Sequence, residues 1–251
     1  DIILNNAVTG DFTLTTDAGA GGDVTIGNGL DVDTWTITAA DTLNTNGTIQ
    51  TDAAQDYSNA TTLTMTGATT LVASDGVYPT NAQDITFDAA NVINGGQNLI
   101  VRGDTVTLDR INTAGALTVV GQTAVVVNDN INTTGVQDFT GATTLNANTT
   151  STNDNITFNN AVTVGNTARV DSGGGGAGDI TFSAAVDGAN ALTVDAGNAS
   201  VDFAANVGGG TPLDTLDVIG GTINLQQVDT TNQQTYNGDT TLNADLTSAA
   251  A

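Results

Sequence analysis

Short stretches of alternating apolar and polar residues recur along the whole chain. Each consists of a small polar residue, an apolar residue, a residue that is often Thr, and a final apolar residue, as in DITF at residues 84–87 and 179–182. This alternation puts the two apolar side chains on one face of a strand and the Thr on the other. We call each stretch a rung. Eight rungs predict eight short strands with one buried face, and they begin at Asp1, Asp23, Asp84, Thr105, Asn155, Asp179, Ser200 and Thr222.

The rungs are spaced at nearly constant intervals. The second residues of successive rungs are separated by 22 residues from Ile2 to Val24, 21 from Ile85 to Val106, 24 from Ile156 to Ile180, 21 from Ile180 to Val201 and 22 from Val201 to Ile223. A period near 22 residues with short strands predicts a β-solenoid, whose coils stack about 4.8 Å apart. A β-sandwich has turn signals every 8–12 residues without this longer register. We therefore expect an all-β solenoid of roughly 11 coils with almost no helix.

A longer sequence element occurs three times. It reads IQTDAAQDYSNATTL at residues 49–63, INTTGVQDFTGATTL at 131–145 and VDTTNQQTYNGDTTL at 228–242. Each copy, which we call a signature frame, has an aliphatic residue first, Thr third, Gln seventh, an aromatic residue ninth and Thr-Thr-Leu at its end. This pattern indicates a repeated building element and not a catalytic apparatus. The aromatic residues are Tyr57, Phe139 and Tyr236.

The third frame also sets the phase of the chain. Aligned on the second frame at an offset of 97 residues, it puts Ala251 on Asp154, so the next position would be Asn155. Residues 155–163 (NITFNNAVT) are the best internal match to residues 1–9 (DIILNNAVT). We therefore expect residues 1–251 to form a single β-solenoid segment that is one period of a longer array or stacks head to tail with copies of itself. An arbitrary cut through an irregular array is the alternative.

Three stretches are expected to be loops. Residues 74–84, which include Pro79, interrupt the period and predict a loop that bulges from one coil. The Gly-rich stretches DAGAGGD at residues 17–23 and DSGGGGAGD at 171–179 both precede a rung, which predicts corners between strands.

Composition agrees with this architecture. The chain has 30 Gly and contains no Glu, Lys, His or Cys, so its 27 acidic residues are all Asp. Thr, Val, Asn, Asp and Gly favour strands and tight turns over helices. No run of 18 apolar residues occurs, which argues against insertion in a membrane. The net charge of −24 argues against binding of nucleic acid and favours a soluble, self-repelling surface.

The residue types restrict the chemistry. A His or Lys base and the usual zinc ligands are absent, so we expect neither an enzyme nor a cofactor and assign no catalytic residue. Solenoid enzymes that degrade polysaccharides remain a less favoured alternative, because paired Asp carboxylates can hydrolyse glycosides. Such enzymes commonly add a basic residue. The chain offers only Arg102, Arg110 and Arg169, and the first two are expected to pair with Asp104 or Asp109.

Two further binding functions receive weak support. Gly175–Gly178 with Asp179 resembles a calcium-binding repeat, but its spacing fails; Asp31 and Asp33 begin like an EF-hand loop that lacks its Glu. Weak binding of Ca²⁺ at Asp-rich corners stays open, without assigned ligands. The Thr runs at residues 34–38 and 62–66 are compatible with ice binding, although outward Thr is also ordinary in strands.

The rung and frame motifs together resemble the repeat regions of filamentous-haemagglutinin-like large exoproteins. The resemblance rests on residues 179–182, 185–189, 191–194 and 234–242, and it extends over most of the chain from Ile49. It implies a right-handed parallel β-helix in a secreted or surface-attached bacterial fibre. We thus expect an extracellular or cell-surface structural segment that associates head to tail or continues in a longer chain. A module that binds surface glycans is the alternative.

Overall fold

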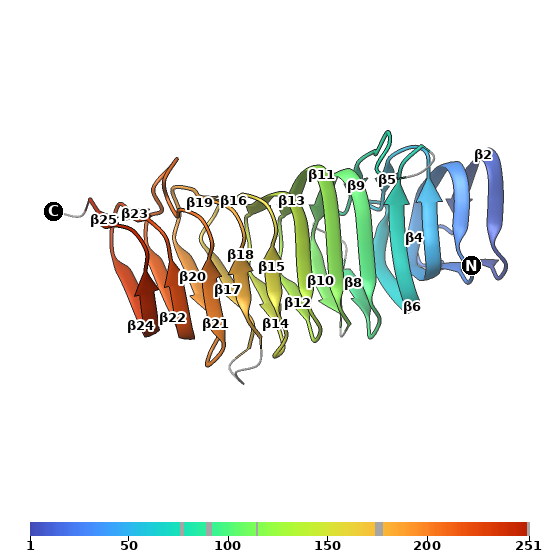
Figure 1. The fold of residues 1–251 in the computed structure, drawn as a ribbon. Helices are drawn as coiled ribbons and strands as arrows, with labels where there is room; N and C mark the ends of the chain where they lie inside the picture. The colour runs from blue at the N-terminus through green and yellow to red at the C-terminus, as the bar shows by residue number, and fades with distance from the viewer. Residues whose placement is uncertain (76–77, 89–91, 114, 174–177, 250–251) are drawn as a thin grey trace. The chain divides into compact units, whose positions relative to one another are not determined.

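The computed structural model describes residues 1–75, 78–88, 92–113, 115–173 and 178–249, which form strands and turns without a helix (Figure 1). Parallel strands stack into a β-solenoid of about 12 turns that lie about 20 residues apart in the chain. The prediction of an all-β solenoid is confirmed, with coils slightly shorter than the expected 22 residues. Contacts divide the chain into two compact units, Asp1–Val125 and Val126–Ala251.

The first unit contains a long strand that follows the turns of its coil while it stays hydrogen-bonded to the neighbouring coils. This strand, β4 (Leu30–Thr51), has 22 residues and pairs in parallel with strands of the coils on either side. The other strands of the unit are β1 (Ile2–Leu4), β2 (Val8–Asp17), β3 (Val24–Ile26), β5 (Gln55–Asp56), β6 (Ala60–Ala73), β7 (Ile85–Thr86), β8 (Val92–Gly95), β9 (Leu99–Leu108), β10 (Arg110–Thr113) and β11 (Leu117–Val127), which ends two residues past the boundary.

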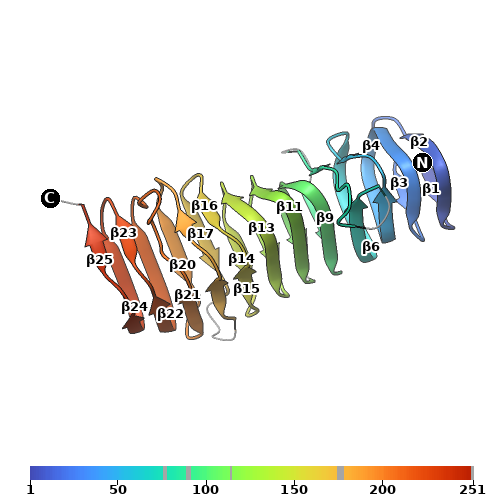
Figure 2. The same ribbon diagram turned by 45° about the horizontal axis from the view of Figure 1, so that its top comes forward.

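The second unit has three columns of parallel strands, and Figure 2 shows its coils as successive layers. One column contains β15, β18 and β21, another β16 and β19, and the third β14, β17 and β20, while β13, β22 and β24 each continue from one column into the next. Its strands are β12 (Ile131–Thr133), β13 (Gln137–Leu145), β14 (Thr149–Ser151), β15 (Ile156–Phe158), β16 (Val162–Val164), β17 (Ala168–Asp171), β18 (Ile180–Phe182), β19 (Val186–Asp187), β20 (Leu192–Asp195), β21 (Ser200–Phe203), β22 (Leu216–Leu225), β23 (Val228–Thr230), β24 (Gln234–Leu242) and β25 (Leu246–Ser248).

The structure confirms all five rung spacings as coil-to-coil registers. Each pair lies directly opposite in neighbouring parallel strands: Ile2 and Val24, Ile85 and Val106, Ile156 and Ile180, Ile180 and Val201, and Val201 and Ile223. Elsewhere the coil length varies, which the rung spacing did not predict. It falls to 18 residues from Ile131 to Thr149 and rises to 30 from Leu63 to Ile93.

The longest coil contains the predicted loop of residues 74–84. The Ser74 hydroxyl donates a hydrogen bond to the Thr80 carbonyl oxygen at 2.7 Å, and Ser74 forms an isolated antiparallel bridge with Ala82. Residues 76 and 77 of this loop lie outside the described residues. Residues 17–23 form a corner before β3, as predicted, whereas Gly174–Ala177 of the second Gly-rich stretch are not among the described residues.

Alternation within each strand produces the core. In β15 and β18, for example, the two apolar residues are buried and the Thr between them is half-buried on the outer face. The core of the second unit contains a ladder of four Phe side chains whose successive ring centroids lie 4.8–5.0 Å apart with planes within 9° of parallel. Stacking at this spacing adds ring contacts to every layer of backbone hydrogen bonds. The four residues are Phe139, Phe158, Phe182 and Phe203.

In the rungs that begin with Asp1, Asp84, Asn155 and Asp179, the opening polar residue has a shared role. Its side-chain oxygen accepts a hydrogen bond from the backbone N–H at the matching corner of the next coil. The distances are 3.0 Å from Asp1 to Asp23 N, 3.0 Å from Asp84 to Thr105 N and 2.9 Å from Asn155 to Asp179 N. Short acceptor side chains satisfy backbone donors at chain corners, which explains why Asp or Asn begins these rungs.

Candidate functional site

The three signature frames form the same corner in the structure. In each frame the chain leaves one strand at the Thr, turns, and begins the next strand at the Gln. The Thr hydroxyl closes the turn by donating to the carbonyl oxygen two residues later, at 2.6 Å in the first frame and 2.7 Å in the second and third. These Thr residues are Thr51, Thr133 and Thr230.

The Gln side chain then connects two coils. Its amide Nε2 donates to a backbone carbonyl oxygen of the following coil: Gln55 to Val72 at 2.7 Å, Gln137 to Thr150 at 2.7 Å and Gln234 to Thr247 at 2.8 Å. In every case the acceptor belongs to the residue stacked on the second position of the same frame. The Gln is therefore a clamp between layers.

The ninth residue of the frame completes the corner in two of the three copies. The Tyr57 hydroxyl donates to Gln55 Oε1 at 2.7 Å, and the Tyr236 hydroxyl donates to Gln234 Oε1 at 2.9 Å. In the second frame the aromatic residue has no hydroxyl, and the Thr149 hydroxyl donates to Gln137 Oε1 in its place. The same amide oxygen is satisfied by a different donor.

This corner is a buried polar network, and its polar atoms are paired. Gln55 and Gln137 are almost fully buried, and among the described residues no buried side-chain nitrogen or oxygen lacks a hydrogen-bond partner. An unpaired buried amide would be costly, so the Gln and its partners depend on each other. The sequence identified the frame but not this role. Alternation could have indicated it, because Gln and the aromatic residue two positions later share the inner face of one strand.

The two end layers of the coil stacks differ from the inner layers. In the C-terminal layer, inward-facing Leu242 and Leu246 are 42% and 44% exposed, whereas Leu225 one coil earlier is 0% exposed. In the N-terminal layer, inward-facing Ile2 and Leu4 are half-buried, whereas Val24 and Ile26 of the next coil are 0% exposed. β24 with β25 forms the last layer of its unit, and β1 with β2 forms the first layer of its unit (Figure 2). Each end layer thus presents apolar side chains and a strand edge.

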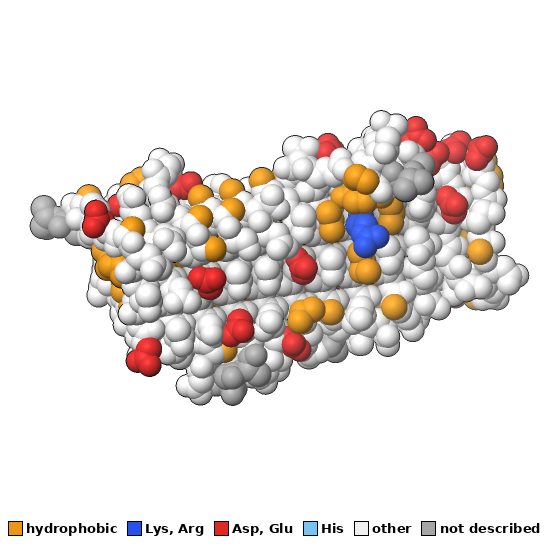
Figure 3. Space-filling view, in the orientation of Figure 1, with side chains coloured by type: hydrophobic (Ala, Val, Ile, Leu, Met, Phe, Trp, Pro, Cys, Tyr) orange, Lys and Arg blue, Asp and Glu red, His pale blue; other side chains and the backbone are white. Residues whose placement is uncertain are grey.

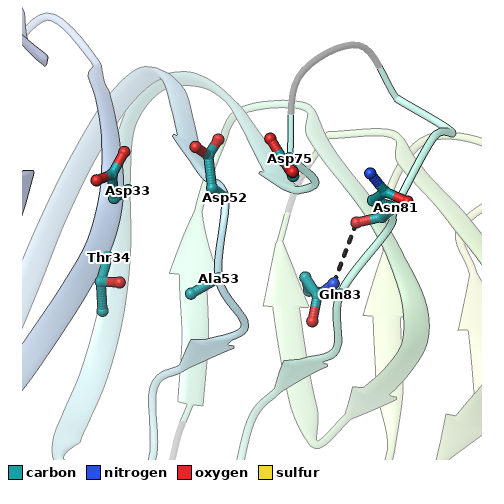
Figure 4. Close-up of a pocket in the computed structure, with 7 residues that line it drawn as sticks. All are labelled: Asp33, Thr34, Asp52, Ala53, Asp75, Asn81 and Gln83. Carbon is teal, nitrogen blue, oxygen red and sulfur yellow. Dashed lines mark hydrogen bonds between the residues drawn. The ribbon is translucent and has the colours of Figure 1, made fainter. Parts of the chain in front are cut away.

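A polar hollow lies on a corner of the first unit. It has a volume of about 590 Å³, and Asp33, Asp52 and Asp75 line it from successive coils (Figure 4). Asn81 and Gln83 complete the wall, with Gln83 Nε2 donating to the Asn81 carbonyl oxygen at 3.2 Å. A neighbouring smaller hollow adds further Asp side chains, and acidic side chains gather along this edge in the space-filling view (Figure 3).

The chemical capacity of the acidic edge is limited by its composition. The residues that line the larger hollow include three carboxylates, one hydroxyl and two amides, without an aromatic or basic side chain. Across the described residues, no group of three Asp side chains is arranged to hold a metal ion. Of the stretch Gly175–Gly178, whose spacing does not match a calcium-binding repeat, residues 175–177 lie outside the described residues. Weak binding of Ca²⁺ at Asp-rich corners and hydrolysis by paired Asp carboxylates, the less favoured alternative, are both untested.

Among the remaining candidate side chains, Arg169 has a structural role. Arg169 donates to the carboxylates of Asp171 at 3.0 Å and Asp195 at 2.6 Å, which joins two neighbouring coils on the outer surface. The pairing of Arg102 and Arg110 with Asp104 or Asp109 stays a prediction. The Thr run at residues 62–66 does not continue as a Thr array, because Thr64 is stacked between Asn44 and Asn94.

In the part of the chain that the structure describes, no helix is long and apolar enough to cross a membrane. Comparison of the chain with protein-family models, curated proteins and solved structures finds no significant match. The function is therefore inferred from the architecture and from the end layers.

Proposed function

We propose that this chain is a structural segment of an extracellular or cell-surface fibre, built by end-to-end stacking of β-solenoid coils. The exposed end layers carry this proposal. Their inward-facing residues are of the same types as the buried residues of inner layers, so stacking would bury apolar surface and pair free strand edges in one step. The resemblance to haemagglutinin-like exoprotein repeats supports the extracellular assignment.

The stacked architecture suits a mechanical role that needs no ligand or catalysis. Every coil adds a set of parallel backbone hydrogen bonds and a layer of apolar contacts, and in repeat proteins such nearest-neighbour terms add along the array. The Gln clamps and the stacked rings tie successive coils together in addition to the backbone. An array of this kind gains length without a new fold.

The stacking proposal can be tested with variants that block one end each. Leu4→Asp puts a charge into the N-terminal layer, and Tyr236→Asp puts one into the C-terminal layer. Sedimentation velocity should show concentration-dependent assemblies for the unmodified chain, monomers for either variant alone, and dimers for their mixture, because each variant keeps one intact end. Monomers of the unmodified chain at all concentrations would refute end-to-end stacking.

Adhesion to glycans is a second candidate, and the hollow at Asp33, Asp52 and Asp75 is the feature that favours it. Carboxylates and amides can accept and donate hydrogen bonds to sugar hydroxyls. Binding of the unmodified chain and of an Asp33→Asn/Asp75→Asn variant to a glycan array would test this adhesive function. Binding that the double variant loses would support an adhesive module, and an array without signal would leave only the structural role.

A further inference from the structure

We propose that residues 1–4 of a second copy of this chain seat on residues 234–236, with Ile2 opposite Gln234, Ile3 opposite Thr235 and Leu4 opposite Tyr236. This register rests on the proposed end-to-end stacking and adds the partner surface on each copy. It makes the third signature frame a binding site for a rung.

The two inner frames show what kind of strand covers a frame. In the first unit, the rung of residues 84–87 lies on the first frame, with Ile85 opposite Gln55. In the second unit, the rung of residues 155–158 lies on the second frame, with Ile156 opposite Gln137. Both covering strands are rungs that begin with Asp or Asn and continue with Ile. Residues 1–4 have the same beginning.

The first residue of these rungs has the same hydrogen bonds. Asp84 and Asn155 accept a bond from the frame through their carbonyl oxygens, at 2.9 Å from Gln55 N and 2.9 Å from Gln137 N respectively. Their side chains accept the next coil's N–H, as Asp1 does from Asp23 at 3.0 Å. Asp1 therefore already has the side-chain hydrogen bond to the next coil. In the proposed junction, the carbonyl oxygen of Asp1 would accept the second bond, from Gln234 N.

The side chains at the junction are complementary in the same way. The aromatic residue of each inner frame is fully covered by the last residue of its rung, Tyr57 by Phe87 and Phe139 by Phe158. Tyr236 is half-buried and Leu4 of the N-terminal layer is half-buried as well. Placing Leu4 on the Tyr236 ring would bury both.

The register extends along the strands. Thr144 of the second frame lies opposite Thr163, and Thr62 of the first frame lies opposite Val92. Both frames thus place the residue seven positions after the rung's Ile against the second Thr of Thr-Thr-Leu. At the proposed junction these positions are Thr9 and Thr241, both exposed in this structure. The two contacts, Ile3–Thr235 and Thr9–Thr241, define one register.

Cysteine crosslinking tests this register. The chain contains no Cys, so only the introduced residues can form disulfides. Directly opposed residues of parallel strands have Cα atoms about 4.8 Å apart, which suits a disulfide. Ile3→Cys and Thr235→Cys chains are mixed and oxidised mildly, as are Thr9→Cys and Thr241→Cys chains. The crossed mixtures, Ile3→Cys with Thr241→Cys and Thr9→Cys with Thr235→Cys, are the matched controls.

An internal control shows whether this geometry forms a bond. Asp138 and Thr157 are directly opposed at the equivalent position of the second frame, so the Asp138→Cys/Thr157→Cys chain should form an intrachain disulfide. Each single-cysteine chain is also oxidised alone. These reactions measure links between two N-terminal or two C-terminal ends.

The expected result is linked dimer as the major product in both matched mixtures and only background in the crossed mixtures and the single chains. Sedimentation could show assemblies while disulfide links form in the crossed mixtures or the single chains, or form in no mixture at all. Each of these results would overturn the register but leave end-to-end stacking intact. Absence of both links and assemblies would overturn the proposed function as well.

Discussion

The ring of Tyr57 lies flat against the ring of Phe87 in the next coil, with centroids 4.9 Å apart and planes 9° from parallel. Phe139 and Phe158 have the same relationship, at 5.0 Å and 9°. Tyr236 occupies the same place in its frame but remains half-buried at the end of its unit. This difference between two covered frames and one uncovered frame is the basis of the proposed stacking.

Shortening a ring within the Phe ladder should destabilise the second unit strongly. Phe182 is 0% exposed and stacks on Phe158 and Phe203. Phe182→Ala should lower the free energy of unfolding by about 3–5 kcal/mol, because it leaves a cavity in the middle of the stack. Urea unfolding monitored by circular dichroism measures this. Phe12→Ala, at a side chain that is 41% exposed, is the control and should cost about 1 kcal/mol or less.

Replacing a Gln clamp should lower the free energy of unfolding even when the new side chain has the same size. Gln137→Met keeps the length and volume of the side chain, but it leaves the Thr150 carbonyl and the Thr149 hydroxyl without their buried partner. The free energy of unfolding should fall by about 1–3 kcal/mol. Gln122→Met, at an exposed position, is the matched control and should have little effect. Equal effects of the two substitutions would contradict the clamp.

Alkaline pH should weaken the fold through its buried tyrosines. Burial raises the pKa of Tyr236 to about 12 from 10.0 and raises the pKa of Tyr57 further. Below pH 10 both folded and unfolded chains hold these protons, so stability does not change. Above it the unfolded chain releases them first, and stability should fall by up to about 1.4 kcal/mol per pH unit for the fully buried Tyr57, and by less for Tyr236, which solvent partly screens.

Urea titrations between pH 8 and pH 11 measure this decline. Tyr57→Phe should lose about 1 kcal/mol at pH 8, because the hydrogen bond to Gln55 is lost, but its stability should fall less steeply above pH 10. An unchanged slope in this variant would show that alkaline unfolding begins elsewhere.

Salt should promote assembly of the unmodified chain. Each copy has a net charge of −24, so copies repel one another, and the Debye length falls from about 30 Å at 0.01 M salt to about 10 Å at 0.1 M. Sedimentation in increasing NaCl should show larger assemblies at a given protein concentration. Stacking that weakens in salt would indicate attraction between opposite charges instead.

Chelation should leave these assemblies intact, because strand edges and apolar contacts form the proposed junction. Sedimentation with and without EDTA at constant ionic strength checks this. Assemblies that dissociate only in EDTA would assign a metal to the acidic edge, and Asp33→Asn/Asp75→Asn would then have the same effect as EDTA.

The regular parts of this fold follow from local sequence, and the irregular parts do not. The spacing of Ile156, Ile180 and Val201 predicts their register, because alternation and period are properties of the chain alone. The continuous course of β4 through 22 residues was not predicted, since it depends on which neighbours its corners meet. The frame was visible as a repeat, but the partner of Gln137 was not, because Thr150 comes close only after the coil has closed.

Helical reconstruction of assemblies of the unmodified chain by cryo-electron microscopy would show the junction between copies itself. We expect parallel strands about 4.8 Å apart to continue across the junction between copies, with Leu4 of one copy on the ring of Tyr236 of the next. Single chains whose two end layers remain in solvent, or copies joined through two equal ends, would contradict it.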